Sequence, residues 1–334
     1  MKKIALFFIL LFIIFSTPTL ANNKTSDINI LYTIDNNYPN FTLLSINSIL
    51  KNNKSKSSYT FYIIENNLSQ KNKLKMQTFI EKRGQKVHFI NIKQQDLSLF
   101  GLYNHPSVNY ITSIALARIF APNLLPQNIN RILYLDADTL TISDLKEIYN
   151  IDLENNIAGL VLNDEQAIYP KSFHTFKNGY YNSGVILFDL EKCRKEKCTE
   201  KIVSYYLKNI DDFTASKEKE IGHYFYLIDQ DLISLAWDGQ IKSLNPKWNQ
   251  QHYKIFNCGI LHYTGNYKPW DFHFRNRASK IYVAYWKEIP ELKFYKYLYA
   301  LKSFYKKYQK SLKNKLNKQN LHLRKYILNT SSLQ

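Results

Sequence analysis

Four short apolar runs that alternate with helix-like segments constrain the fold of this chain more than any other feature. The runs are rich in β-branched and aromatic residues and cover residues 28–34, 59–64, 87–92 and 131–135. Apolar residues at helical spacing occur between them, at residues 38–50, 70–82 and 111–120. Strands that alternate with helices in this way form βαβ units, so the sequence predicts an α/β fold whose central sheet is mostly parallel and flanked by helices.

The loop after the first run carries no glycine-rich phosphate motif. It reads Thr33-Ile34-Asp35-Asn36-Asn37-Tyr38, with neither G-x-G-x-x-G nor G-x-x-x-x-G-K-[ST]. If this fold binds a nucleotide, something other than backbone amides must neutralise the diphosphate. A metal ion would do so.

Two aspartates directly follow the fourth run. Residues i and i+2 of a strand point the same way, so we expect the carboxylates of Asp136 and Asp138 to project together from the sheet edge. Ligands of open α/β sheets bind outside the carboxyl ends of the strands. A divalent cation would relieve the repulsion between the carboxylates. The alternative is a solvated pair of aspartates in a turn.

The N-terminus has the layout of an export signal. Met1-Lys2-Lys3 is followed by an apolar run at residues 4–15, then by Pro18 and the small residue Ala21. The run is shorter than the roughly 20 residues that span a bilayer. We expect residues 1–21 to be a cleaved signal peptide, with an uncleaved anchor as the alternative. The folded part of the chain would then be periplasmic, secreted or lumenal.

The formal net charge of +18 is concentrated at the C-terminus. Residues 292–334 contain ten lysines, one arginine and no acidic residue, and so supply 11 of the 18 excess positive charges. In proteins that bind nucleic acid, the basic residues more often form one face of the folded domain. We therefore expect no nucleic-acid partner. Leucines and tyrosines recur every three or four residues at 298–316, which is typical of an amphipathic helix on an anionic membrane. The alternative is a solvated helix packed on the core.

Three cysteines are too few for a disulfide scaffold. Cys193 and Cys198 could oxidise in an exported protein or remain as two inert thiols, and Cys258 stands apart from them. Their spacing, without a second pair, argues against a zinc site.

Several motifs follow one another in a fixed order along the chain. Around the D-x-D pair they are Ala115-Leu116-Ala117-Arg118, Tyr181-Asn182-Ser183-Gly184, Asp229-Gln230-Asp231, Leu261-His262-Tyr263-Thr264-Gly265 and Lys268-Pro269-Trp270. This ordered set, over about residues 28–270, resembles glycosyltransferase family 8. Its bacterial members build lipopolysaccharide outer cores, and its eukaryotic relatives include glycogenin. The resemblance implies a GT-A-like nucleotide-binding fold and transfer of a hexose from a UDP-sugar.

The resemblance implies a metal site and a diphosphate site. Asp136, Asp138 and His262 match the family's metal ligands, and this mixture of oxygen and nitrogen donors suits Mn²⁺, with Mg²⁺ possible. Lys268 matches its diphosphate-contacting lysine, and Gly265 would let the backbone approach the phosphates. A lone histidine is more often a core or surface residue, so the role of His262 depends on these neighbours.

The remaining matches concern the nucleoside and the sugar. Asp35 and Asn37 match the loop that contacts uridine and ribose, although both residue types also suit a simple turn. Asn182, Ser183 and Gly184 match an Asn-Ala-Gly triplet that lines the donor sugar, and the Ser183 hydroxyl is an expected extra sugar contact.

Other candidates lie near the reacting carbon or at the edge of the site. Asp229 and Gln230 match the family's pair near the anomeric carbon, where Gln230 would hold the developing positive centre or position the acceptor. Arg118 would either donate to a ribose or phosphate or form an ion pair at the edge of the core. Asp164 falls where the family often places another sugar-binding carboxylate.

The resemblance implies a Mn²⁺-dependent retaining glycosyltransferase that moves glucose or galactose from a UDP-sugar to a glycan or glycolipid acceptor such as lipopolysaccharide core. We expect a catalytic domain at residues 27–275 and a basic helical extension at 276–334. One alternative is a non-catalytic relative that binds sugar nucleotides or glycans. Another is a phosphohydrolase of the haloacid-dehalogenase type. In that class a threonine follows two residues after the second aspartate, whereas Thr139 follows Asp138 directly.

Overall fold

The computed structural model describes residues 27–92, 113–163, 176–209, 228–251, 255, 257–265, 268–271, 276–293, 308 and 311. The predicted signal segment, the candidate Asp164 and almost all of the predicted C-terminal amphipathic helix lie outside these residues. Among the described residues, no helix combines the length and the apolar character needed to cross a membrane.

A seven-stranded sheet forms the centre of the molecule, in the order β3-β2-β1-β4-β7-β6-β8. Its strands, in chain order, are β1 Asp27–Asp35, β2 Ser58–Asn66, β3 Lys86–Asn91, β4 Arg131–Leu135, β6 Ala158–Leu162, β7 Tyr181–Asp189 and β8 Ile241–Ser243. The first four are mutually parallel, as are β6 and β8. Strand β7 runs antiparallel to both of its neighbours, β4 and β6. The prediction of a mostly parallel sheet is therefore confirmed.

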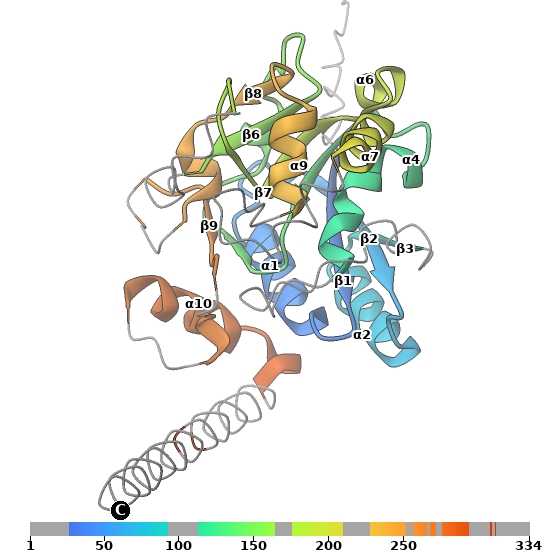
Figure 1. Cartoon of the computed structure of the whole chain (residues 1–334). Helices are drawn as coiled ribbons and strands as arrows, with labels where there is room; N and C mark the ends of the chain where they lie inside the picture. The colour runs from blue at the N-terminus through green and yellow to red at the C-terminus, as the bar shows by residue number, and fades with distance from the viewer. Residues whose placement is uncertain are drawn as a thin grey trace, which may run out of the picture.

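Helices cover both faces of this sheet (Figure 1). They are α1 Pro39–Lys51, α2 Gln70–Glu81, η1 Ser113–Phe120, α4 Ala121–Leu124, α5 Lys146–Tyr149, α6 Leu190–Lys195, α7 Cys198–Lys208, α9 Ile228–Ala236, η4 Pro246–Asn249, η5 Pro269–Asp271, α10 Arg277–Lys287 and η6 Pro290–Leu292. Buried residues of α1, α2 and α10 form one hydrophobic core with the sheet. Those of η1, α6, α7 and α9 form a second core on the opposite face.

Side-chain alternation along the strands separates the two cores. In β1, Ile28, Ile30 and Tyr32 belong to the core with α1, whereas Leu31 between them belongs to the core with η1. A strand buried on both faces has apolar residues at nearly every position, which is why the sequence shows continuous runs. The four predicted strands match β1 to β4 to within two residues at each end.

A small second sheet lies beside the carboxyl end of β4. It pairs β5 (Thr139–Thr141) antiparallel with β9 (Ile260–His262). Because β5 begins one turn after β4 ends, this pairing brings a late segment of the chain next to the two aspartates of the D-x-D motif.

Residues 276–293 pack on the main core. Tyr282 and Trp286 of α10 are almost fully buried, and their rings lie near those of Trp270 and Phe41. Trp286 also donates a hydrogen bond from its indole nitrogen to the carbonyl oxygen of Leu292. Residues 276–293, the first part of the predicted extension, are therefore in contact with the hydrophobic core.

The three cysteines are free thiols. Cys193 and Cys198 are fully buried where α6 meets α7, and the Cys193 thiol contacts the carbonyl oxygen of Ile157 at 3.4 Å. The hydrogen bond between the two thiols, together with burial, raises the pKa of the Cys193 thiol well above its usual range. This arrangement is that of the two inert thiols and not of a disulfide.

Candidate active site

The D-x-D motif forms a tight turn between β4 and β5. The amide and the hydroxyl of Thr139 both donate to the carbonyl oxygen of Asp136, at 3.1 and 2.8 Å. Strand β4 ends at Leu135, so Asp136 and Asp138 are not two positions of one pleated strand. The sequence-based geometry is wrong on this point. The turn brings the carboxylates to the same cleft.

The antiparallel direction of β7 brings a second motif to this turn. Leu135, the last residue of β4, pairs with Val185, and the amide of the following residue, Asp136, donates to the carbonyl oxygen of Gly184 at 2.8 Å. The start of β7 therefore lies at the end of β4. Asn182, Ser183 and Gly184, predicted from the sequence as one triplet, line the same cleft as the aspartates.

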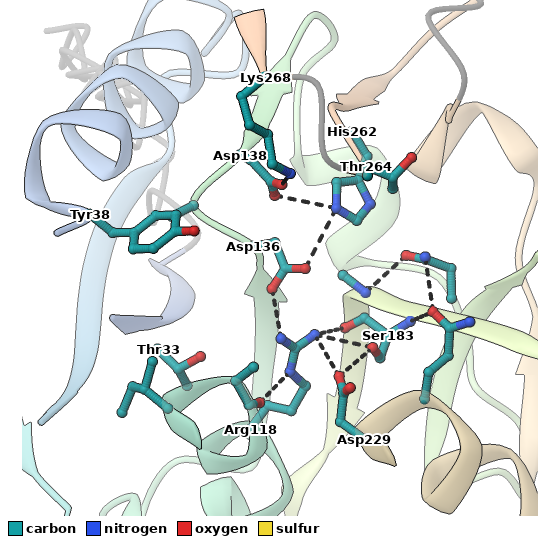
Figure 2. A pocket seen from close by; sticks show the side chains of 17 residues that line it. Thr33, Tyr38, Arg118, Asp136, Asp138, Ser183, Asp229, His262, Thr264 and Lys268 are labelled. Atoms are coloured by element: carbon teal, nitrogen blue, oxygen red, sulfur yellow. Dashed lines mark hydrogen bonds and ion pairs between the residues drawn. The ribbon is translucent and has the colours of Figure 1, made fainter. Parts of the chain in front are cut away.

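Pairing of β9 with β5 brings His262 to the aspartates. Thr139 and His262 are opposite each other in the small sheet. The Nε2 atom of His262 lies 3.5 Å from Oδ2 of Asp136 and 3.3 Å from Oδ1 of Asp138. Figure 2 shows the imidazole directed at both carboxylates. The three residues that the resemblance assigns to the metal thus converge in space.

Their geometry fits a divalent cation. One ligand atom from each of Asp136, Asp138 and His262 can be chosen so that all three lie within 4.8 Å of one another. A β-carbon at Gly184 would lie 2.0 Å from Cε1 of His262 and 2.8 Å from Oδ2 of Asp136, so only glycine leaves room for this cluster. Two carboxylates with one imidazole form a donor set that Mn²⁺ accepts.

Arg118 of η1 supports the cluster from below in the view of Figure 2. Its Nη2 atom lies 3.0 Å from Oδ1 of Asp136, and Nη1 lies 3.3 Å from Oδ2 of Asp229. Nη1 also donates to the carbonyl oxygen of Ser183 at 2.7 Å, and Nε donates to that of Ala115 at 2.7 Å. The side chain is buried, so the geometry favours the predicted ion pair over a direct substrate contact.

Tyr134 was not singled out in the sequence, yet it contacts the same carboxylate. Its hydroxyl donates to Oδ1 of Asp136 at 2.5 Å and lies 3.1 Å from the hydroxyl of Thr33. Burial, which outweighs the nearby charge of Arg118, raises the pKa of Tyr134 well above its usual range, so the phenol keeps its proton and remains a donor. One oxygen of Asp136 is therefore fully engaged, and the other is left facing His262.

The charges around Asp138 are strongly coupled. Burial opposes ionisation of Asp138, but Lys268 and His262 together hold the pKa of its carboxyl well below the usual range. Nζ of Lys268 lies 2.5 Å from Oδ2 of Asp138 and donates to the carbonyl oxygen of Tyr263 at 2.7 Å. Burial would lower the pKa of His262, but the charge of Asp138 and hydrogen bonds to both carboxylates raise it to about 9. The metal-free site therefore holds cations against its carboxylates.

The predicted pair Asp229-Gln230 opens helix α9 at the other side of the cleft. The hydroxyl of Ser183 donates to Oδ2 of Asp229 at 2.7 Å, so this hydroxyl is used inside the protein. Oε1 of Gln230 accepts from Nδ2 of Asn182 at 3.0 Å, and the Ser183 amide lies 3.4 Å from it. Gln230 is 2% exposed, and its Nε2 atom has no hydrogen-bond partner in the described part of the chain.

Two of the predicted contacts lie at the edge of the site. Asp35 and Asn37 form a turn in which Oδ1 of Asp35 accepts from the amide of Asn37 at 2.8 Å. Neither lines the cleft, although the next residue, Tyr38, does.

Gly265 lines the cleft with a φ of +81°, and a β-carbon there would meet nothing within 4 Å. Glycine is therefore required at this position by the backbone conformation.

A family model described as glycosyl transferase family 8 matches residues 29–273, which span all of these motifs. The chain belongs to glycosyl transferase family 8. This membership supports the predicted hexosyltransferase activity and confirms the resemblance drawn from the sequence.

Two curated proteins illustrate the similarity of this chain to known sequences. General stress protein A of Bacillus subtilis is 25% identical over 236 residues, which cover 64% of this chain and 77% of the relative. Lipopolysaccharide 1,2-glucosyltransferase of Escherichia coli K12 is 29% identical over 199 residues, which cover 54% of this chain. The chain spans about half, 52%, of the length of that enzyme.

Solved structures confirm the GT-A-like fold. The galactosyltransferase LgtC, crystallised with donor and acceptor sugar analogues, superposes with a TM-score of 0.67 at 17% sequence identity. The superposition covers 80% of this chain and 100% of LgtC.

Proposed function

We propose that this protein transfers glucose or galactose from a UDP-sugar to a glycan or glycolipid, with retention at the anomeric carbon and with Mn²⁺ as cofactor. The observation that carries this proposal is the convergence of Asp136, Asp138 and His262 beside Lys268 in one cleft. A divalent cation bound there would offset the charge of the diphosphate as its bond to the sugar breaks.

Lys268 supplies the second positive charge at this end of the cleft. Its ammonium group already contacts Asp138, so a short movement of a flexible side chain would bring it to a phosphate oxygen. Gly265, in its left-handed conformation, turns the chain between His262 and Lys268. We assign both residues to the binding of the leaving UDP. The predicted contacts of Asp35 and Asn37 with the nucleoside would lie next to Tyr38, at the neighbouring end of β1.

The other side of the cleft suits the sugar. Asn182 and Gln230 lie there, and Nε2 of Gln230, which has no partner among the described residues, is a buried donor for a sugar or acceptor oxygen. Its Oε1 already accepts from Nδ2 of Asn182, which makes attack by this oxygen on the sugar unfavourable. Gln230 would therefore act by positioning the reactants. The role predicted for Asp164 near the sugar remains part of this proposal.

The hydrogen bonds of Asp229 bear on stereochemistry. Its carboxylate is bound by Arg118 and by the hydroxyl of Ser183, so it is held away from the roles of nucleophile or general base. We infer that the acceptor hydroxyl attacks the face from which UDP leaves. The bond from the anomeric carbon to phosphate breaks, the bond to the acceptor oxygen forms, and the acceptor proton passes to the leaving phosphate oxygen.

The acceptor is proposed from the relatives. The Escherichia coli relative is a lipopolysaccharide glucosyltransferase, and a glycolipid acceptor would also suit the basic C-terminal segment. We propose that residues 1–21 direct export and that residues 294–334 bind an anionic membrane. Liposome flotation of the full chain and of a chain ending at Lys293 tests the second point. Equal flotation would contradict it.

UDP release tests the activity. Purified protein is incubated with individual UDP-sugars and candidate glycans, with Mn²⁺ or with EDTA. We expect release from UDP-glucose or UDP-galactose that stops in EDTA and returns with Mn²⁺, and a product that keeps the α configuration by NMR. Binding of a UDP-sugar without release under every condition would instead support the non-catalytic alternative.

A further inference from the structure

Asn249 lies directly behind the imidazole of His262. It is the last residue of η4 and is 2% exposed. Its Oδ1 atom lies 2.8 Å from Nδ1 of His262, and its Nδ2 atom lies 2.7 Å from Oδ1 of Asn182. The side chain of Asn249 therefore connects the imidazole to the motif that begins β7.

The backbone fixes which atom of each amide is the donor. The oxygen and nitrogen of an asparagine side chain are exchangeable by a flip, so a fixed donor is needed to orient them. The amide of Gly184 is such a donor, and it reaches Oδ1 of Asn182 at 3.0 Å. Asn249 must then offer its Nδ2 to this oxygen. Its own Oδ1 consequently faces His262 and accepts a proton from Nδ1.

The hydrogen bond between Asn182 and Gln230 runs in the same direction as that between Asn249 and Asn182: each amide nitrogen donates to the oxygen of its neighbour. With its oxygen committed to Gly184 and Asn249, Asn182 donates from Nδ2 to Oε1 of Gln230. The amide of Ser183, which can only donate, lies 3.4 Å from the same oxygen. Two backbone amides thus impose one orientation on three side-chain amides.

We propose that Asn249 is a positioning residue that keeps a proton on Nδ1 of His262, and so presents the lone pair of Nε2 to a divalent cation between Asp136 and Asp138. This inference rests on the metal site of the proposed function. Histidines that bind metals commonly donate their second ring N–H to a fixed acceptor, which sets the tautomer and the ring orientation.

Backbone hydrogen bonds join the residue after Asn249 to strand β9. The amide of Gln250 donates to the carbonyl oxygen of Ile260 at 2.8 Å, and the amide of His262 donates to that of Gln250 at 3.0 Å. Trp248 packs so closely on Gly259 that a β-carbon there would lie 2.7 Å from the indole ring. The acceptor and the imidazole are thus carried by segments hydrogen-bonded to each other.

Two substitutions separate the acceptor role from simple packing. Asn249→Leu keeps the side-chain volume but removes the acceptor, whereas Asn249→Asp keeps an oxygen that accepts from Nδ1. Mn²⁺ affinity in the presence of UDP is measured by the EPR signal of free Mn²⁺. We expect roughly 10–100-fold weaker binding by Asn249→Leu. Asn249→Asp should show a smaller loss, because it keeps the acceptor for Nδ1 but places its second oxygen against Oδ1 of Asn182. Asn53→Leu, at a half-buried amide in the loop after α1 that hydrogen-bonds Ser57, controls for loss of an amide elsewhere.

The tautomer itself is read by ¹⁵N NMR of histidine-labelled protein, with His262→Gln to assign the signal. In wild-type protein with the diamagnetic ion Mg²⁺ and UDP, we expect a proton on Nδ1 and none on Nε2. A proton on Nε2 in that state, or unchanged Mn²⁺ affinity in folded Asn249→Leu, would overturn the inference. Failure of the wild-type protein to bind any divalent ion would instead overturn the metal site itself, so the two failures are distinguishable.

Discussion

Arg118 binds one carboxylate oxygen of Asp136 and leaves the other oxygen to face His262. Its guanidinium lies 3.0 Å from Oδ1 of Asp136 and, together with the phenol of Tyr134, occupies that oxygen, while Oδ2 faces His262. The same arginine reaches Asp229 on the opposite side of the cleft. The buried guanidinium of Arg118 therefore links the turn that carries Asp136 to the start of α9, which carries Asp229.

Replacement of Arg118 by methionine would leave two carboxylates without their cation. Breaking a buried ion pair by removing one partner costs about 3–5 kcal/mol. We expect a loss of this size in the free energy of unfolding, measured by urea denaturation in EDTA, together with loss of UDP release. Arg83→Met removes an exposed pair with Glu291 and should cost less than about 1 kcal/mol. Equal effects of the two substitutions would contradict the role given to Arg118.

Gly184→Ala tests the space reserved for the cluster. Gly184 is not among the residues with positive φ, so alanine is compatible with the backbone, but its β-carbon would overlap the His262 ring. We expect Mn²⁺ binding and UDP release to fall to background in a protein that still unfolds cooperatively. Gly239→Ala is the control, because its φ of +74° gives strain without a close contact to the site. Wild-type Mn²⁺ affinity in Gly184→Ala would show that the close approach has no functional role.

Ser183→Ala tests the hydroxyl that was expected to contact the sugar. Since this hydroxyl donates to Asp229 and lies 3.2 Å from Nη1 of Arg118, its loss should destabilise the protein by about 1.5–3 kcal/mol, the range for hydrogen bonds to charged groups. The ratio of UDP release from UDP-glucose and UDP-galactose should stay the same. A change in that ratio without loss of stability would favour a direct sugar contact.

The raised pKa of His262 predicts how metal-free protein responds to pH. Its folded-state pKa is about 9, above the value of about 6.5 for an unfolded histidine. The protonated imidazole therefore stabilises the fold fully below about pH 6.5, and this contribution is lost as the pH rises through about 9. In EDTA, the melting temperature of the wild type should fall across this interval. His262→Gln should show a smaller fall, and parallel curves would contradict the assignment.

Strands β1, β2 and β4 were predictable because they are buried on both faces, so their apolar runs are continuous. The edge strand β3 is only partly buried, and its short β-branched and aromatic run was sufficient to predict it. Asp136 and Asp138 were predicted from their place directly after the fourth apolar run, and His262 was predicted from a family motif. The sequence does not reveal that β7 runs antiparallel to β4, and this direction is what brings Gly184 against Asp136. Nor does it reveal that the second aspartate lies in a turn.

Residues that support the site from behind gave no signal in the sequence. Asn249 is a single asparagine in a turn with a tryptophan, where its most common role is a local hydrogen bond. Its function depends on the pairing of β5 with β9 and on the packing of η4 against β9, which are long-range contacts. Tyr134 was hidden for a similar reason, because an aromatic residue in a buried strand is expected to serve the core alone.

The central claim is that Asp136, Asp138 and His262 bind a divalent cation that holds a nucleotide diphosphate. Its most direct test is a Mn²⁺ titration of metal-stripped protein followed by EPR, with and without UDP, for the wild type and for Asp138→Asn. The account predicts that the wild type removes Mn²⁺ from solution, more tightly with UDP, and that folded Asp138→Asn does not. Equal Mn²⁺ binding by the two proteins would contradict it.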